Sequence, residues 1–520
     1  MSQKTRGIIA AGHEKTAAAG IEMFQNGGNA FDAAVAAILA SFVAEPGLTS
    51  AAGGGFLLAH TQNNQNILFD FFSQTPRQKR NLSEINFYPV EVSFVDAVQE
   101  FHIGMGSMAV PGNIAGVFHV HQKLGRLPFH VVAEPAIHYA KNGLPLNRFQ
   151  YYCLAEVLKP IITTDKGGQQ VFSLTGEPLE PEATLRMTEF AETLIYLTEK
   201  GSKEFYEGDI AHQLVKDCQD FGGYLTLEDL KHYRVIEREP LTINYRGNTL
   251  LTNPPPSSGG TLMAFALKLL SNIDLTQLEF GRTHHLETLA QVMRLTNEAR
   301  KDSYDANLHQ ENVAERFLAD EHLFKYANQF TETVNKWGST THISVLDGEG
   351  NAASVTTSNG EGSGYVIPGT GIMVNNMLGE EDINPQGFHQ WKENVRISSM
   401  MAPTIVLKNN QPEIVLGTGG SKRIRTAILQ VISNILDFEM PVKEAVDSPR
   451  VHWENNVFNL EPGLAPDEVL NKIRLPGSTQ LVKWQDKSLF FGGVHTIGET
   501  PEGLMAGAGD HRRDGVVASC

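Results

Sequence analysis

Apolar and polar positions follow two different periods along the chain, which predicts helices and strands in turn. The run AFDAAVAAILASFV, Ala30–Val43, is apolar almost throughout, which is typical of a helix buried on all sides, and it is too short to span a bilayer. Residues 412–436 are predicted to form a strand, a glycine turn and a long helix. Because such patterns interleave without a long linker, we expect one interlocked α/β body.

A hairpin is predicted within KWGSTTHISVLDGEGN, residues 336–351. Ile343 and Val345 alternate with polar residues, residues 347–351 have the composition of a turn, and residues 352–356 resume a strand pattern. The threonine pair at its start has two interpretations. It is either part of a threonine-rich edge strand, or Thr340 is a nucleophile that cleavage converts into an N-terminus.

Composition narrows the class of protein. The chain has 520 residues with 42 basic and 59 acidic side chains, a formal charge of 42 − 59 = −17, which disfavours nucleic acid and anionic membranes as partners. The cysteines, Cys153, Cys218 and Cys520, are odd in number and widely spaced, so neither a disulfide framework nor a metal knuckle is expected. Residues 1–25 lack a signal-peptide pattern, and we expect a cytoplasmic protein.

Of the sequence motifs that support acyl transfer, an N-terminal threonine is the one that this chain retains. The chain has no GxSxG elbow, and its GTGGSK stretch lacks phosphate-loop spacing. The backbone N–H groups of Gly419 and Gly420, at a strand-to-helix turn, either stabilise an oxyanion or simply form the turn. Ser398 and Ser399 precede a strand and are either site residues or a loop end. An N-terminal threonine remains, whose α-amino group can act as the base for its own hydroxyl.

Metal and cofactor chemistry is not expected. His119 and His121 would lie on different faces of a helix, and residues 284–287 lack the HExxH spacing of a zinc helix. Acyl transfer by an N-terminal threonine needs only protein groups, so we expect neither a metal nor an organic cofactor.

Eight segments, in order, resemble the γ-glutamyltranspeptidase family of N-terminal nucleophile hydrolases, over essentially the whole length of the chain. They are GGNAFDAAVA (27–36), EPGLTSAAGGGF (45–56), VPGNIAG (110–116), NPPPSSGG (253–260), TTHISVLDGEGN (340–351), SSMMAPTIV (398–406), GTGGSKRI (417–424) and FGGVHTI (491–497).

The resemblance implies a fold and a maturation step. The fold is a four-layer αββα sandwich, made as one chain that cuts itself between Ser339 and Thr340. Residues 1–339 become a large portion and residues 340–520 a small one, and both stay in one structural unit. Thr340 is the nucleophile in self-cleavage and in turnover. The partners it implies are a small amide or γ-glutamyl-type substrate and the other fragment of the same chain.

The resemblance also assigns roles in the site. It implies that the hydroxyl of Thr357 or Ser358 supports the nucleophile. It also implies that the substrate is contacted by Asn359, Glu380, Ser398 and Ser399, and that Gly419 and Gly420 donate to the oxyanion.

Two positions depart from the family pattern. Phe72 stands where the family has an arginine that clamps the donor α-carboxylate, and Met377 stands where it has a glutamine. A phenyl ring cannot replace a bidentate guanidinium. Residues that could supply a substitute cation are Arg77, Arg396, Lys422 and Arg423.

Three hypotheses follow. In the first, the protein is a self-processing amidohydrolase or acyltransferase whose donor differs from a standard γ-glutamyl group. In the second, it is a true γ-glutamyltransferase or glutathione hydrolase with a relocated carboxylate clamp. In the third, it is a non-catalytic scaffold that never cleaves.

Overall fold

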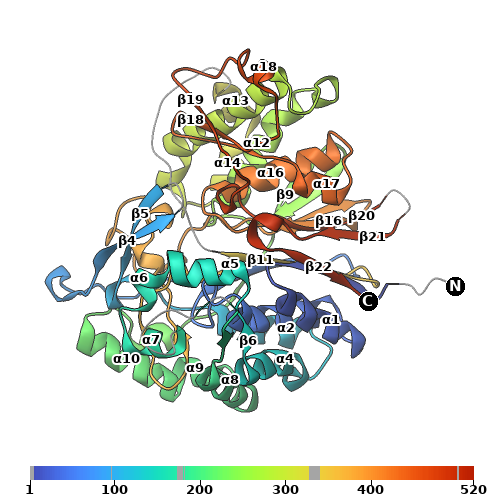
Figure 1. The fold of residues 1–520 in the computed structure, drawn as a ribbon. Coiled ribbons are helices and arrows are strands. Elements are labelled where there is room, and N and C mark those ends of the chain that lie inside the picture. The colour runs from blue at the N-terminus through green and yellow to red at the C-terminus, as the bar shows by residue number, and fades with distance from the viewer. Residues whose placement is uncertain (1–4, 95–96, 173–179, 181, 327–339, 501–502) are drawn as a thin grey trace.

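Two stacked β-sheets lie between two layers of helices, as Figure 1 shows for the computed structural model. The structure describes residues 5–94, 97–172, 180, 182–326, 340–500 and 503–520. This is the predicted αββα arrangement, in which each sheet buries one face against the other sheet and one against helices.

The first sheet has seven strands, and its neighbouring strands are antiparallel. Its order is β22 (Val516–Ser519), β1 (Gly7–Ala11), β11 (Thr341–Asp347), β12 (Ala352–Ser358), β2 (Gly54–His60), β3 (Asn66–Phe71) and β8 (Ile236–Arg238).

The second sheet has six strands, also antiparallel. Its order is β21 (Met505–Ala508), β20 (His495–Glu499), β16 (Gln411–Gly417), β15 (Thr404–Lys408), β10 (Asn248–Thr252) and β9 (Leu241–Tyr245). Between the two sheets, Phe56, Leu58, Leu346, Ile405 and Val415 form an apolar core.

Helices cover the two outer faces (Figure 1). The layer against the first sheet contains α1 (Glu14–Gln25), α2 (Ala30–Ala44), α3 (Asn113–Leu124), α4 (Phe129–Asn142) and α8 (Thr188–Lys200). The layer against the second sheet contains α12 (Gly259–Ser271), α13 (Thr283–Ala299), α16 (Arg423–Leu436) and α17 (Val442–Asp447). Smaller elements at the periphery include α10 (Asp209–Phe221), the hairpin β4 (Tyr88–Phe94) and β5 (Ala97–Ile103), and the sheet β17 (Val451–Glu454), β18 (Val457–Leu460) and β19 (Gln480–Lys483).

Helix α2 is the buried helix predicted from the apolar run, and all of its residues are buried. Asn29 caps it, with its side chain accepting from the N–H groups of Phe31 and Asp32 while the Asp32 carboxylate accepts from the Asn29 N–H. This reciprocal pair satisfies donors that a helix start leaves unpaired. The helix ends at Ala44, and the next residue, Glu45, brings a carboxyl group to the start of β11.

The predicted hairpin forms, but β11 is an inner strand of the first sheet, so the edge-strand interpretation of the threonine pair is wrong. His342 and Ser344 of β11 are buried, because they face the second sheet instead of solvent. His342 is hydrogen-bonded through Nδ1 to the Thr356 hydroxyl (2.8 Å) and through Nε2 to the Ser344 hydroxyl (3.0 Å). Ser344 donates to the backbone oxygen of His495 on the second sheet (3.0 Å).

Several histidines are buried, and burial is the largest cause of a lowered pKa in each of them. Burial lowers the pKa of His13, His285 and His495 to about 4, and it lowers the pKa of His342 and His452 well below the usual value. A histidine with a lowered folded-state pKa binds its proton more readily in the unfolded chain. Its contribution to stability is therefore complete above pH 6.5 and is lost as the pH falls towards 4.

We expect His285→Gln to weaken this pH dependence. Between pH 6.5 and 4, removing one buried histidine should reduce the slope of the free energy of unfolding against pH by up to ~1.4 kcal/mol per pH unit. Urea titrations at several pH values measure it, in a Thr340→Ala background so that unfolding starts from one chain. His232→Gln, at an exposed histidine, is the control; equal slopes in the two variants contradict the expectation.

Candidate active site

The hairpin places Thr340 immediately before β11, on the face of the sheet that looks towards the second sheet. Thr341 pairs with Thr357 across the hairpin, which puts Thr340 opposite Ser358. Since neighbouring residues of a strand point to opposite faces, Thr340 and Ser358 share one face, and Thr341 and Thr357 share the other. Ser339, on the other side of the predicted cleavage point, lies outside the described residues.

A cavity of about 30 Å³ adjoins Thr340, which is itself only 6% exposed. This volume is enough to admit a water molecule but is far below the size of a typical small-molecule pocket. The residues that line it come from both sheets and the loops between them, and they are Phe72, Thr340, Ser358, Met377, Glu380, Asp382, Ile383, Ser399, Met400, Met401, Ser421 and Ile424. Six residues singled out from the sequence are therefore brought together here.

The two candidates for the supporting hydroxyl lie in different surroundings. Thr357 faces the α2 layer, where its hydroxyl accepts a hydrogen bond from Thr49 (3.0 Å). Ser358 lines the cavity beside Thr340, and its hydroxyl accepts from the N–H of Gly360 (2.9 Å). The geometry therefore favours Ser358 for the role next to the nucleophile.

Paired variants distinguish these two hydroxyls. We expect Ser358→Ala to lower kcat by about 10- to 100-fold, because it removes a polar group that faces the nucleophile. Thr357→Val is expected to cost about 1 kcal/mol of stability through the lost hydrogen bond with Thr49, with a much smaller effect on kcat. Steady-state kinetics and thermal unfolding of both variants measure this. The reverse pattern would return the role to Thr357.

The glycine turn between β16 and α16 lies directly beside Thr340. A Cβ on Gly419 would lie 2.0 Å from the Thr340 carbonyl oxygen, so only glycine fits this approach. Gly420 has a φ of +127°, a conformation that disfavours other residues. Within the described part of the chain, neither N–H has a hydrogen-bond partner. These two N–H groups can therefore receive a developing oxyanion.

Two buried charged residues beside Thr340 were not predicted from the sequence. Arg513 donates from Nη1 to the Thr340 carbonyl oxygen (3.0 Å). Glu45 accepts from the hydroxyls of Thr341 (2.5 Å) and Thr16 (2.7 Å). Burial raises the pKa of Glu45, although these hydrogen bonds and the charge of Arg513 act in the opposite direction. Arg513 thus holds the carbonyl group of Thr340, and Glu45 holds the side chain of the next residue.

The paired serines lie next to the cavity, although only one lines it. The Ser399 hydroxyl accepts from the N–H of Met401 (3.0 Å), and Ser399 is a lining residue. The Ser398 hydroxyl is 3.1 Å from that of Ser258 and lies just outside the lining. Asn359 is buried but also lies outside it.

Glu380 lies at the cavity among other carboxyl groups. Burial raises the pKa of its carboxyl well above the usual value, and the neighbouring charges of Glu361 and Asp382 add to the effect. Its Oε1 atom is buried and has no hydrogen-bond partner among the described residues. A cationic group entering the cavity would stabilise the ionised form, as the predicted contact with a substrate amino group requires.

The two departures from the family pattern fill space at the cavity. Phe72 and Met377 are each 1% exposed, and Phe72 stacks on Phe56 with ring centroids 5.3 Å apart. Apolar side chains therefore stand where a clamp arginine and a glutamine were expected, and they leave a small space beside Thr340.

The candidate substitute cations do not line this cavity. Arg396 is buried behind Phe72, where its Nη1 donates to the Phe72 carbonyl oxygen (2.8 Å) and its Nε lies 3.1 Å from Asp70 Oδ1. Lys422 Nζ lies 3.4 Å from Asp382. Arg423 is buried over the Phe490 ring, and burial lowers its pKa to about 10. Like these three, Arg77 is absent from the cavity lining.

Two other kinds of site are absent from the described ranges. Those residues contain no group of three or more His, Cys, Asp or Glu side chains placed to hold a metal ion. They also contain no helix whose length and apolar character would let it cross a membrane.

Comparison with known proteins assigns the family. Residues 16–520 match the family model described as Gamma-glutamyltranspeptidase. The chain belongs to the gamma-glutamyltranspeptidase family. This assignment agrees with the resemblance of the eight sequence segments.

Members of the family with different names are similar to this chain to the same degree. The glutathione hydrolase proenzyme of Escherichia coli (strain K12) is 29% identical over 98% of this chain and 90% of its own length. The Acylase ACY 1 proenzyme of Pseudomonas sp. (strain V22) is also 29% identical, over 98% and 93%. The crystal structure of cephalosporin acylase from Bacillus halodurans covers 99% of this chain and 96% of its own, with a TM-score of 0.86 and 26% identity.

These comparisons confirm the family and the αββα fold predicted from the sequence. They also establish that this gamma-glutamyltranspeptidase family member is an enzyme of the amide hydrolase and acyltransferase class. Both glutathione hydrolase and acylase names occur among similar proteins, so family membership leaves the acyl donor to be decided from the site itself.

Proposed function

We propose that the protein cuts itself between Ser339 and Thr340 and then uses Thr340 to cleave an amide whose acyl group differs from a standard γ-glutamyl group. The observation that carries this proposal is that Thr340 lines a cavity together with Ser358, while the glycine turn at Gly419 lies directly against the Thr340 carbonyl group. A nucleophile, a neighbouring hydroxyl and oxyanion donors are the parts that acyl transfer needs.

In the proposed reaction, the new α-amino group of Thr340 accepts the proton of its hydroxyl as Oγ attacks the substrate carbonyl. The tetrahedral oxyanion lies against the N–H groups of Gly419 and Gly420. The C–N bond then breaks, and the leaving amine takes the proton from the α-amino group. Water or an amine attacks the resulting ester, which releases the acyl group and restores the Thr340 hydroxyl.

The sheet topology supports two portions, 1–339 and 340–520, that remain together after cleavage. In the first sheet, β1 of the large portion pairs with β22 and β11 of the small portion on its two sides. In the second sheet, β10 of the large portion pairs with β15 of the small one. Backbone ladders in both sheets would thus hold the fragments in one body.

Phe72 favours a non-standard donor, because it removes the carboxylate clamp and none of the suggested cations replaces it at the cavity.

A specific observation favours the second hypothesis, a true γ-glutamyltransferase. Glu380 and Ser399, which the resemblance links to the donor amino and carboxylate groups, do line the cavity.

A panel of acyl p-nitroanilides, which share one leaving group, tests the proposal. We expect wild-type protein to acquire the mass of the acyl group on the 340–520 fragment, with the modification on Thr340. Simple acyl anilides should react with higher kcat/KM than the γ-glutamyl anilide. A preference for γ-glutamyl favours the second hypothesis, and a chain that remains whole and unmodified favours a non-catalytic scaffold.

A further inference from the structure

The first residue pair of the nucleophile's hairpin is held by one turn of the chain. Strand β11 begins at Thr341, whose hydroxyl donates to Glu45 Oε2 (2.5 Å). Its partner across the hairpin, Thr357, accepts from the hydroxyl of Thr49 (3.0 Å). Glu45 and Thr49 belong to the same turn, which is closed by a hydrogen bond from the Thr49 N–H to the Glu45 carbonyl oxygen (3.2 Å). The turn that follows α2 therefore holds both strands at the pair next to the nucleophile.

The contact between Glu45 and Thr341 is closed to water. Glu45 is 0% exposed, and its Oε1 accepts a second hydrogen bond from the Thr16 hydroxyl (2.7 Å). A Cβ on Gly12 would lie 2.4 Å from Glu45 Oε2 and 3.0 Å from Thr341 Oγ1, so a side chain there would displace the pair. A carboxylate accepts stronger hydrogen bonds than a neutral group does, and exclusion of water strengthens them further.

The proposed cut changes what this contact does. It turns Thr340 into a chain end, one residue before β11, and the first residues of a chain are poorly ordered unless contacts tie them down. Strand β12 has no such need, because it continues along the chain in both directions. Once residue 339 is detached, the position of Thr340 depends on the contacts made by its own residue and by Thr341. Among them are Arg513 at the Thr340 carbonyl oxygen (3.0 Å) and Glu45 at the Thr341 hydroxyl.

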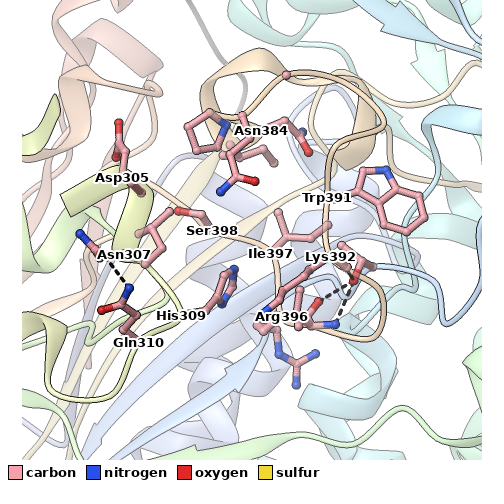
Figure 2. Close-up of a pocket in the computed structure, with 18 residues that line it drawn as sticks. Asp305, Asn307, His309, Gln310, Asn384, Trp391, Lys392, Arg396, Ile397 and Ser398 are labelled. Atoms are coloured by element: carbon pink, nitrogen blue, oxygen red, sulfur yellow. Dashed lines mark hydrogen bonds between the residues drawn. The ribbon is translucent and has the colours of Figure 1, made fainter. Parts of the chain in front are cut away.

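Glu45 and Thr341 lie outside the spaces that adjoin the site. Neither residue lines the cavity at Thr340. Neither lines the larger pocket of about 330 Å³ in Figure 2, whose wall is formed mostly by segments 305–310 and 383–398. Loss of their contact can therefore change the position of the nucleophile without removing a group that lines either space.

We infer that Glu45 is a positioning residue, which fixes Thr340 after self-cleavage by holding the hydroxyl of Thr341. The inference rests on the proposed function, because it concerns the N-terminus that the cut creates. It extends that function to a carboxyl group on the α2 side of the first sheet, behind the face that carries the nucleophile.

Two valine variants separate this role from general stability. Thr341→Val and Thr16→Val each delete one hydroxyl that is bonded to the Glu45 carboxyl group, and both side chains are at most 3% exposed. Only the first substitution releases the residue next to the nucleophile. Thr341→Ser keeps the hydroxyl and is the conservative control.

Hydrogen exchange of the cut proteins measures the order at the start of β11. We expect the amides of residues 342–344 to exchange about tenfold faster in Thr341→Val than in the wild type, because the strand end opens more readily. Thr16→Val and Thr341→Ser should stay within about twofold of the wild type.

The uncut chain provides the comparison that a purely structural contact would not pass. In a Thr340→Ala background, the bond to residue 339 still tethers the strand. Thr341→Val should therefore accelerate exchange there by less than about twofold. A contact that only stabilises the fold would give the same acceleration in cut and uncut chains.

Kinetics of the separated cut enzyme supply a second readout, with acetyl p-nitroanilide as the probe. We expect kcat of Thr341→Val to fall about fivefold, because the nucleophile spends less time in its reactive position. KM should stay within about twofold of the wild type, since no group that lines the cavity changes. Thr341→Ser should restore kcat to within about twofold of the wild type.

The outcomes separate this inference from the function on which it rests. If the wild type never cuts itself, no new N-terminus exists and both are overturned. If it cuts, but the two valine variants exchange alike or Thr341→Val acts equally in cut and uncut chains, the positioning role is wrong and self-cleavage stands. If exchange follows the expectation but no anilide acylates Thr340, the proposed turnover is overturned and the positioning role stands.

Discussion

Thr340→Ala is expected to leave the purified protein as one uncut chain without measurable turnover. The substitution removes the hydroxyl that attacks the preceding peptide bond in self-cleavage and the substrate carbonyl in turnover. Loss of a nucleophile of this kind lowers kcat by on the order of 10⁴-fold or more. Intact mass measurement beside the wild type, followed by assay of both proteins, tests the expectation.

Thr340→Ser is the matched control, because it keeps the hydroxyl and deletes only a methyl group. We expect it to cut itself, with a changed rate, into fragments that meet between residues 339 and 340. Two fragments in the alanine variant would contradict the assignment of Thr340. One chain in both wild type and variant would favour the scaffold hypothesis.

Gly419→Ala is expected to have the next largest effect. The added Cβ would lie 2.0 Å from the Thr340 carbonyl oxygen, so either the glycine turn or the nucleophile must move. Displacing an oxyanion donor costs about 10²- to 10³-fold in kcat. We therefore expect kcat to fall by this amount in whatever fraction of the protein still cuts itself, as measured on chromatographically separated processed enzyme.

Gly369→Ala provides the comparison for this variant. Gly369 has a φ of +73°, and a Cβ there would meet nothing within 4 Å. Alanine at this position carries the backbone strain of a left-handed conformation, of order 1–3 kcal/mol, without touching the site. If Gly419→Ala loses no more activity than Gly369→Ala, the glycine turn has no special role beside Thr340.

The residues at the site fall into two groups according to whether the sequence predicts them. Thr340, Gly419 and Gly420 lie in short motifs whose local backbone follows from their own sequence, a hairpin and a strand-to-helix turn. Arg513 and Glu45 carry no such signal, because they reach Thr340 and its neighbour Thr341 from segments far away in the chain. Their role depends on packing that no short stretch encodes.

The choice between Thr357 and Ser358 also depends on tertiary structure, although the two residues are neighbours in the sequence. The sequence shows that both are hydroxyl residues near the end of a strand. Only the register of β11 and β12 decides which of them shares a face with Thr340, and only the packing of the layers decides that this face looks towards the cavity.

By itself, the sequence of this protein determined the family, the buried helix α2, the hairpin around residue 350 and the strand–turn–helix of residues 412–436. These follow from periodicity and local turn chemistry, which act over a few residues. The tertiary structure alone decided that β11 is an inner strand, that Arg396 lies behind Phe72, and that Phe72 and Met377 line the cavity beside Thr340. Alternation along a strand separates two faces, but what covers each face depends on residues hundreds of positions away.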